Sequence, residues 1–247
     1  MDDNQLMPTN RVTTTQRTVY ITPEQAAAVQ ADFFAKVYAW MAAALGLTGG
    51  VALFASTSPT LLHFVFGTRF VFYGFIIAEL VLVGFLSSRM MEWSRGKVQA
   101  AFVSYAILHG ITLSCIFLIY TSASIASTFF VAGGAFGVMS LFGYFTKADL
   151  SGWGKLLSMA LIGLVIALVV NIFLRNSVLE IVTSFIGVLL FTALTAYDTQ
   201  KLKQLALLGA TQGAETNEKA SILGALTLYL DFVNLFLFLL RIFGRRR

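Results

Sequence analysis

The sequence has few charged residues and only one cysteine. Asp, Glu, Lys and Arg make up 12% of its 247 residues, whereas 57% are hydrophobic, including 23 phenylalanines. A soluble domain of this length could not bury so much apolar surface, so the composition excludes a soluble protein. The single cysteine, Cys115, also excludes an intramolecular disulfide. We therefore expect an integral membrane protein.

Signatures of nucleotide and metal chemistry are missing as well. No phosphate-binding loop or dinucleotide fingerprint occurs, which argues against a nucleotide-driven pump. The two histidines, His63 and His109, lack HExxH-type spacing, so a zinc site is not expected, and His109 fits better as an interhelical donor. The net charge of +5 fits loops that face an anionic lipid leaflet rather than nucleic acid. We expect neither an enzyme, nor a resident cofactor, nor a nucleic-acid partner.

Long apolar runs recur along the chain between short polar breaks. A helix needs about 20 such residues to cross a bilayer, and the runs are continuous rather than alternating, as in a β-barrel. The expected spans are 34–57, 70–91, 98–120, 125–145, 155–174, 180–205 and 221–243. The sequence thus predicts an all-α multi-pass membrane protein with a polar segment at 1–33 and a single transmembrane domain at 34–247. Within the polar segment, Thr22 and Pro23 predict the start of a helix that leads into the first span.

Basic residues in the short loops predict the orientation of the protein in the membrane. The loops after spans two, four and six hold most of them: Arg89, Arg95, Lys97, Lys147, Lys155, Lys201, Lys203 and Lys219. The opposite loops hold only Arg69 and Arg175, so we expect a cytoplasmic N-terminus. The arginines at 245–247 would then lie outside, against this trend, unless the last segment enters the membrane and returns. The absence of Gly and Pro between Thr227 and Phe243 favours a full crossing.

Three carboxylates fall inside the expected spans: Glu79, Asp198 and Asp231. Each costs at least about 2.5–3.5 kcal/mol at such depth, so each should face a partner or a water-filled cavity. Two polar stripes support this expectation because their spacing places them on one face of a helix. The first contains Thr192, Thr195 and Asp198 or Thr199, and the second contains Thr227, Asp231 and Asn234.

The two aspartates should reach the same depth in a helical hairpin. The polar break at 209–220 predicts the turn, and the midpoint between Asp198 and Asp231 falls inside it. Carboxylates in contact cannot easily both ionise, so the pair would share a proton and act as a pH sensor. The alternative is that each aspartate separately bonds a neighbouring Thr, Tyr or Asn and serves packing alone.

Two motifs carry a family resemblance. "AYDTQKL" at 196–202 and "LYLDFVNLFLFLLRIFG" at 228–244, together with "AEL" in the second span, resemble the transmembrane Bax inhibitor motif family over residues 33–244. The short tail and the polar N-terminus are similar to those of bacterial members. The resemblance implies a seven-helix bundle whose last helix is surrounded by the other six, in a bacterial inner membrane.

The resemblance also implies a function, a pH-sensitive calcium leak. Asp198 and Asp231 would be its proton sensor and gate, and they would bind Ca²⁺ only weakly and transiently because a dedicated site needs six to eight oxygens. Arg89 would be a gate partner that pairs with Asp198, and Glu79 matches the second-helix acid of the family. The partners expected are therefore the lipid bilayer, calcium ions and protons.

Two other functions are weighed against the leak. A non-conducting regulator of a membrane-anchored quality-control protease is the main alternative, with the small-residue faces of the spans as contact surfaces. An intramembrane aspartyl protease is disfavoured because the chain has LYLD where such enzymes have GxGD, and no proline after Pro59 to form a PAL element. Calcium flux in liposomes would separate the first two, since a leak needs no partner.

Overall fold

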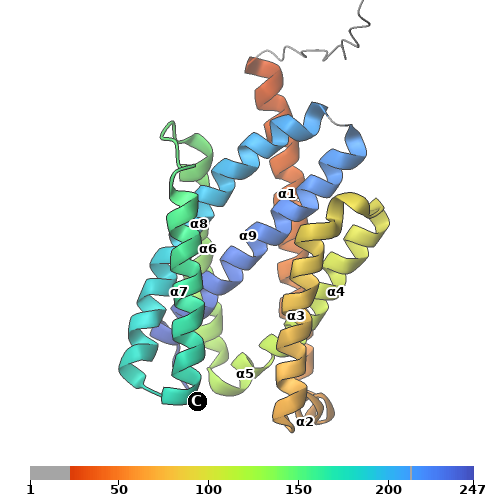
Figure 1. Cartoon of the computed structure of the whole chain (residues 1–247). Coiled ribbons are helices and arrows are strands. Elements are labelled where there is room, and N and C mark those ends of the chain that lie inside the picture. Colours follow the sequence, from red (N-terminus) through yellow and green to blue (C-terminus); the bar gives the residue numbers. More distant parts are fainter. Residues whose placement is uncertain (1–22, 212) are drawn as a thin grey trace, which may run out of the picture.

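The computed structural model describes residues 23–211 and 213–247, and its architecture is a helical bundle (Figure 1). Its helices are α1 (Pro23–Ser56), α2 (Pro59–Phe66), α3 (Arg69–Arg89), α4 (Arg95–Leu113), α5 (Cys115–Ile119), α6 (Ser122–Phe145), α7 (Trp153–Leu174), α8 (Ser177–Thr211) and α9 (Ala214–Phe243), with a 3₁₀ turn at Met90–Glu92. Seven segments are long and apolar enough to cross a membrane when α4 and α5 count as one. The predicted all-α membrane fold with seven spans is confirmed.

The bundle has two ends, named here by the chain termini that they carry. The N-terminal end holds the start of α1 and the α3–α4, α6–α7 and α8–α9 connections. The C-terminal end holds α2, the α5–α6 and α7–α8 connections and the residues after α9 (Figure 1). The basic loops of the sequence therefore gather at the N-terminal end.

Three helices, α1, α8 and α9, extend beyond the ends expected from hydropathy. α1 begins at Pro23 and runs for 34 residues, about 51 Å, so the boundary expected after residue 33 lies inside one continuous helix. Thr22, the expected N-cap, is outside the described residues. The break expected at 209–220 is also mostly helical, and the chain reverses next to Gly213, whose φ of 98° suits glycine. Polar residues end an apolar run without ending a helix, because beyond the bilayer water can solvate their side chains.

α9 is the central helix. In its most apolar stretch 72% of the residues are buried within the protein, against 11% in α3 and in α7. It packs against α1, α4, α6 and α8, while α3 packs on α4 and α7 on α8. In Figure 1, α9 is visible between α3 and α7, which stand on either side of it. The expected central position of the last helix is confirmed.

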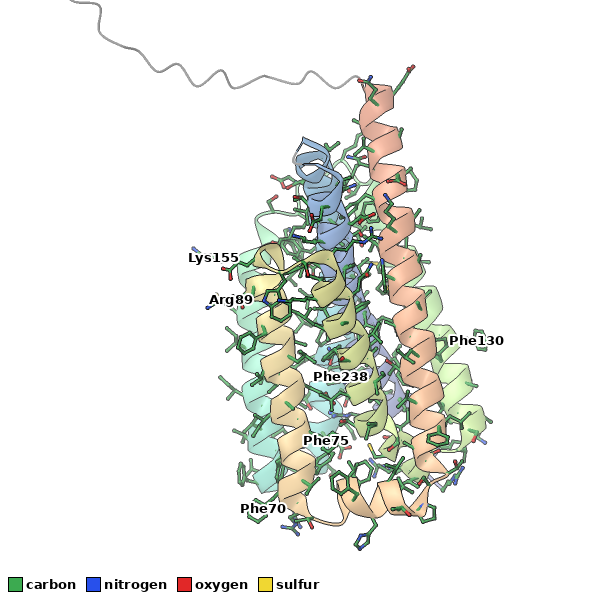
Figure 2. The ribbon with its side chains drawn as sticks, turned by 90° about the vertical axis from the view of Figure 1, so that its right-hand side faces the viewer. Phe70, Phe75, Arg89, Phe130, Lys155 and Phe238 are labelled. Carbon is green, nitrogen blue, oxygen red and sulfur yellow. The ribbon has the colours of Figure 1, made fainter. Side chains whose placement is uncertain are left out.

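The outer helix faces are apolar. Phe70 and Phe130 point away from the bundle (Figure 2) and are 88% and 77% exposed. Close helix contact inside the bundle depends on small residues, as at Gly143, where a Cβ would collide with the backbone of Ala196. Exposed phenylalanines of this kind fit contact with lipid, because their rings lie outside the packed interior of the bundle.

The segment after α9 is fastened to the C-terminal end of the bundle. Arg246 forms a β-bridge with Tyr120, and the amide of Thr121 donates to the carbonyl of Arg245 at 3.1 Å. The Arg246 guanidinium also pairs with Glu180 at the start of α8, at 3.1 Å. α9 therefore runs the full length of the bundle and does not turn back, which agrees with the crossing that the sequence favoured.

Candidate functional site

Asp198 on α8 and Asp231 on α9 meet inside the bundle. Their carboxyl groups lie within hydrogen-bonding contact of each other. The side chain of Asp231 is buried, and its Oδ2 has no hydrogen-bond partner among the described residues. Two carboxylates carry no proton donor when both are ionised, so a hydrogen bond between them requires a shared proton. The contact predicted from the hairpin is thus present, and its role as a sensor stays a prediction.

The aspartates meet despite unequal distances from the turn. Asp198 lies 15 residues before Gly213, whereas Asp231 lies 18 residues after it. α8 and α9 are both inclined near the turn (Figure 1), and a difference of three residues amounts to less than one helical turn. The hairpin argument therefore gives the right pair, although the turn is shorter than the expected one.

A cavity of about 410 Å³ surrounds the pair. Side chains from α3, α4, α7, α8 and α9 line it, and its polar members are Glu79, Tyr105, His109, Asp198, Thr227, Asp231 and Asn234. A second cavity, of about 460 Å³, is lined by Ser87, Lys201 and Gln204, and it shares Asp198 and Thr227 with the first. The two cavities together reach from the aspartates towards the N-terminal end. We call the first one the aspartate cavity.

The same cavity holds a second ionisable pair. The Nδ1 atom of His109 lies 2.9 Å from Oε2 of Glu79, and both side chains are close to 10% exposed. The His109 ring stacks on Tyr105, with ring centroids 5.5 Å apart. The sequence singled out Glu79 without a partner and assigned His109 to an interhelical hydrogen bond. The structure shows that the two predictions describe one contact between α3 and α4.

The polar stripes bond to their own helices. The hydroxyls of Thr195 and Thr227 donate to the carbonyls of Phe191 and Leu223, and Asn234 donates to Leu230 in the same way. Such bonds to the carbonyl one turn earlier satisfy a hydroxyl or amide inside a membrane helix. Of these three, Thr227 and Asn234 line the aspartate cavity together with the aspartates, whereas Thr195 is fully buried and does not line it.

The structure does not bring Arg89 to the aspartates. Its guanidinium pairs with Glu92, at 3.1 Å, with both side chains more than half exposed. Figure 2 places Arg89 at the edge of the bundle, near its N-terminal end. Lys201 is the cation that acts electrostatically on Asp198, and it lines the neighbouring cavity. Its position three residues after Asp198, on the same helical face, is the sequence signal that could have identified it.

Comparison with known proteins gives the family of this chain. Residues 30–247 match the family described as inhibitor of apoptosis-promoting Bax1. The chain is a member of the Bax inhibitor family. Its relatives include inner membrane protein YbhL of Escherichia coli, which is 52% identical over 87% of this chain and 92% of that protein. Uncharacterized proteins of Deinococcus radiodurans and Rickettsia prowazekii are 45% and 44% identical, each over 87% of this chain and 90% of the relative. This member of the Bax inhibitor family is thus a multi-pass membrane protein, and it carries the aspartate pair at the centre of its bundle.

Proposed function

We propose that this protein is a pH-sensitive calcium leak channel of a bacterial inner membrane, gated by Asp198 and Asp231. The observation that carries the proposal is the contact between two carboxyl groups inside a cavity that continues towards one end of the bundle. Carboxylates at this depth cost free energy, and lining a water-filled ion path is one of the few roles for which membrane proteins retain them. The Bax inhibitor family and the inner-membrane relative agree with this setting.

The proposed gate works through the shared proton. With one proton between Asp198 and Asp231, the two helices α8 and α9 stay in contact and the path is shut. Loss of that proton leaves two negative charges side by side, and their repulsion in a low-dielectric interior drives the helices apart. Lys201, which lines the neighbouring cavity, is the cation that would compensate the freed charge.

Calcium is a chemically suitable cargo for this path. It is a hard cation that prefers carboxylate and carbonyl oxygens, of which a stable site supplies six to eight. Within the described residues, no group of three or more His, Cys, Asp or Glu side chains is arranged to hold a metal ion. Two carboxylates would therefore hold Ca²⁺ briefly and release it, as a conduction path requires.

The test is calcium flux into liposomes that contain the purified protein. We expect flux above that of empty liposomes, with a rate that depends on pH because the pair shares a proton. No partner protein is needed for such flux. Flux equal to that of empty liposomes at every pH would contradict the proposal and favour the protease regulator.

The proposed orientation places the N-terminal end of the bundle in the cytoplasm, because the basic loops lie there. We expect a reporter enzyme fused before residue 30 to give the signal of a cytoplasmic location. A reporter inserted in the segment 121–127 should give the signal of a location on the opposite side of the membrane. The matched control is an insertion after Asp149, in the α6–α7 loop, which should behave like the first fusion. A periplasmic signal from the first fusion would invert the whole assignment.

A further inference from the structure

An aromatic side chain of α9, Phe238, lies between the aspartate cavity and the C-terminal end of the bundle. On α9, Phe238 follows Asn234 by four residues and precedes Arg241 by three, so the three lie on one helical face. Asn234 lines the aspartate cavity, whereas Arg241 lines another cavity, of about 510 Å³, at the C-terminal end. These two cavities share no lining residue. Phe238 therefore lies, along α9, between the residues that line the two cavities.

Phe238 is held on three sides. Its ring stacks on Phe191 of α8, with centroids 5.8 Å apart, and Phe191 itself lines the aspartate cavity. A Cβ on Gly187 would lie 2.6 Å from three ring carbons of Phe238, so the ring lies directly on that glycine. The guanidinium of Arg241 lies over the same ring, 5.3 Å from its centroid. Figure 2 shows Phe238 within the bundle, and its exposure is 4%.

A buried apolar constriction of this kind excludes water and ions without any ionisable group. The cation that follows it, Arg241, adds an electrostatic barrier, because a divalent cation entering from the C-terminal end meets a positive charge first. α7 also places an apolar side chain between the two cavities. Buried Leu164 lies between Leu161, which lines the aspartate cavity, and Leu168, which lines the C-terminal cavity.

We propose that Phe238, clamped by Gly187, Phe191 and Arg241, is a second barrier of the pathway, which closes the aspartate cavity towards the C-terminal end. This inference rests on the proposed leak function, but the labelling experiment that tests it does not measure calcium flux. The aspartate pair then controls a cavity that is continuous with the N-terminal end, and the phenylalanine controls the connection to the other side.

Thiol labelling tests the barrier without measuring flux. The starting protein is Cys115→Ser with Asn234→Cys, which places one thiol on the wall of the aspartate cavity. A charged, membrane-impermeant methanethiosulfonate is applied to one side of sealed membrane vesicles of either orientation. We expect labelling from the N-terminal end and only background labelling from the C-terminal end. Adding Phe238→Ala should raise labelling from the C-terminal end to the rate measured from the other end.

The matched control is Phe236→Ala, which removes the same side chain two residues away. Phe236 packs against Phe129 of α6, on another face of α9, and its removal should leave labelling from the C-terminal end at background. Gly187→Ala is a second, milder variant, because its added methyl displaces the Phe238 ring and should also admit the reagent. Unchanged labelling from the C-terminal end in both Phe238→Ala and Gly187→Ala would overturn the barrier.

Calcium flux in liposomes then separates this inference from the proposed function. If the Phe238→Ala protein admits the reagent but no variant conducts calcium, the barrier holds and the leak function fails. If the unaltered protein conducts and Phe238→Ala neither admits the reagent nor changes the flux, the barrier fails and the leak function holds. We expect Phe238→Ala to increase both quantities, and Arg241→Gln to increase calcium entry from the C-terminal end alone.

Discussion

Two ionisable pairs line one cavity, and they differ in whether a side chain supplies the hydrogen-bond donor. The imidazole of His109 carries a ring N–H that can donate to Glu79, so the contact between α3 and α4 has a donor of its own. Asp198 and Asp231 have no donor between them unless a proton is present. The first pair therefore acts as a fixed connection between helices. The second is a contact that exists in one protonation state only.

The largest expected effect is on the aspartate pair. Asp231→Asn and Asp198→Asn each keep the size of the side chain and supply an amide donor, so each helix contact persists at every pH. We expect both variants to insert and fold, and to lose the pH dependence of calcium flux. The measurement is flux against pH in liposomes. Conduction with the pH dependence of the unaltered protein would show that the pair serves packing alone.

The second effect concerns the fixed pair and should appear in stability. His109→Ala leaves the buried carboxylate of Glu79 without its donor, which should lower the free energy of unfolding by about 3 kcal/mol. His109→Gln is the control, because its amide can still donate to Glu79 and should retain part of that stability. Thermal unfolding in detergent measures both, and the shape of the pH profile of flux should not change. A flattened profile in His109→Ala would erase the distinction between the two pairs.

The smallest effect distinguishes the two cations. Removing the charge of Lys201, which acts on Asp198, lets the pair keep its proton to a higher pH. Lys201→Gln should therefore move the midpoint of the flux profile towards higher pH. Arg89→Gln removes an exposed ion pair with Glu92, worth at most about 1 kcal/mol, and should leave the midpoint in place. A larger shift in Arg89→Gln would show that Arg89 reaches Asp198 in another state.

The sequence was sufficient for the spans and for the aspartate pair. Both depend on local patterns, namely apolar runs of membrane length and polar residues at helical spacing around a single turn. The pairing of Glu79 with His109 depends on how α3 and α4 pack, and lipid-facing helices carry no polar outer face that would orient them. The turn lies within the expected segment 209–220, but its length was overestimated for a similar reason. The polar residues on either side of Gly213 mark the edge of the membrane, whereas the helices extend beyond it.

The residues that the sequence could not assign are those whose role depends on where they lie within the bundle. Phe238 is one of 23 phenylalanines, and nothing in its neighbourhood along the chain separates it from lipid-facing residues such as Phe130. Its placement on Gly187 joins residues of two helices that are 51 positions apart. Lys201 is the opposite case. Its helical spacing from Asp198 can be read from the sequence, but the spacing alone does not show that Lys201 acts on Asp198.

The central position of α9 has a consequence for biosynthesis. α9 is synthesised after the other six spans, yet it fills the middle of the bundle that they form. Until it inserts, α1, α4, α6 and α8 lack the helix against which they pack, and Asp198 has no Asp231 beside it. The contact between the two aspartates can form only when the last span arrives. Completion of the fold and formation of this contact are thus a single event in the life of each molecule.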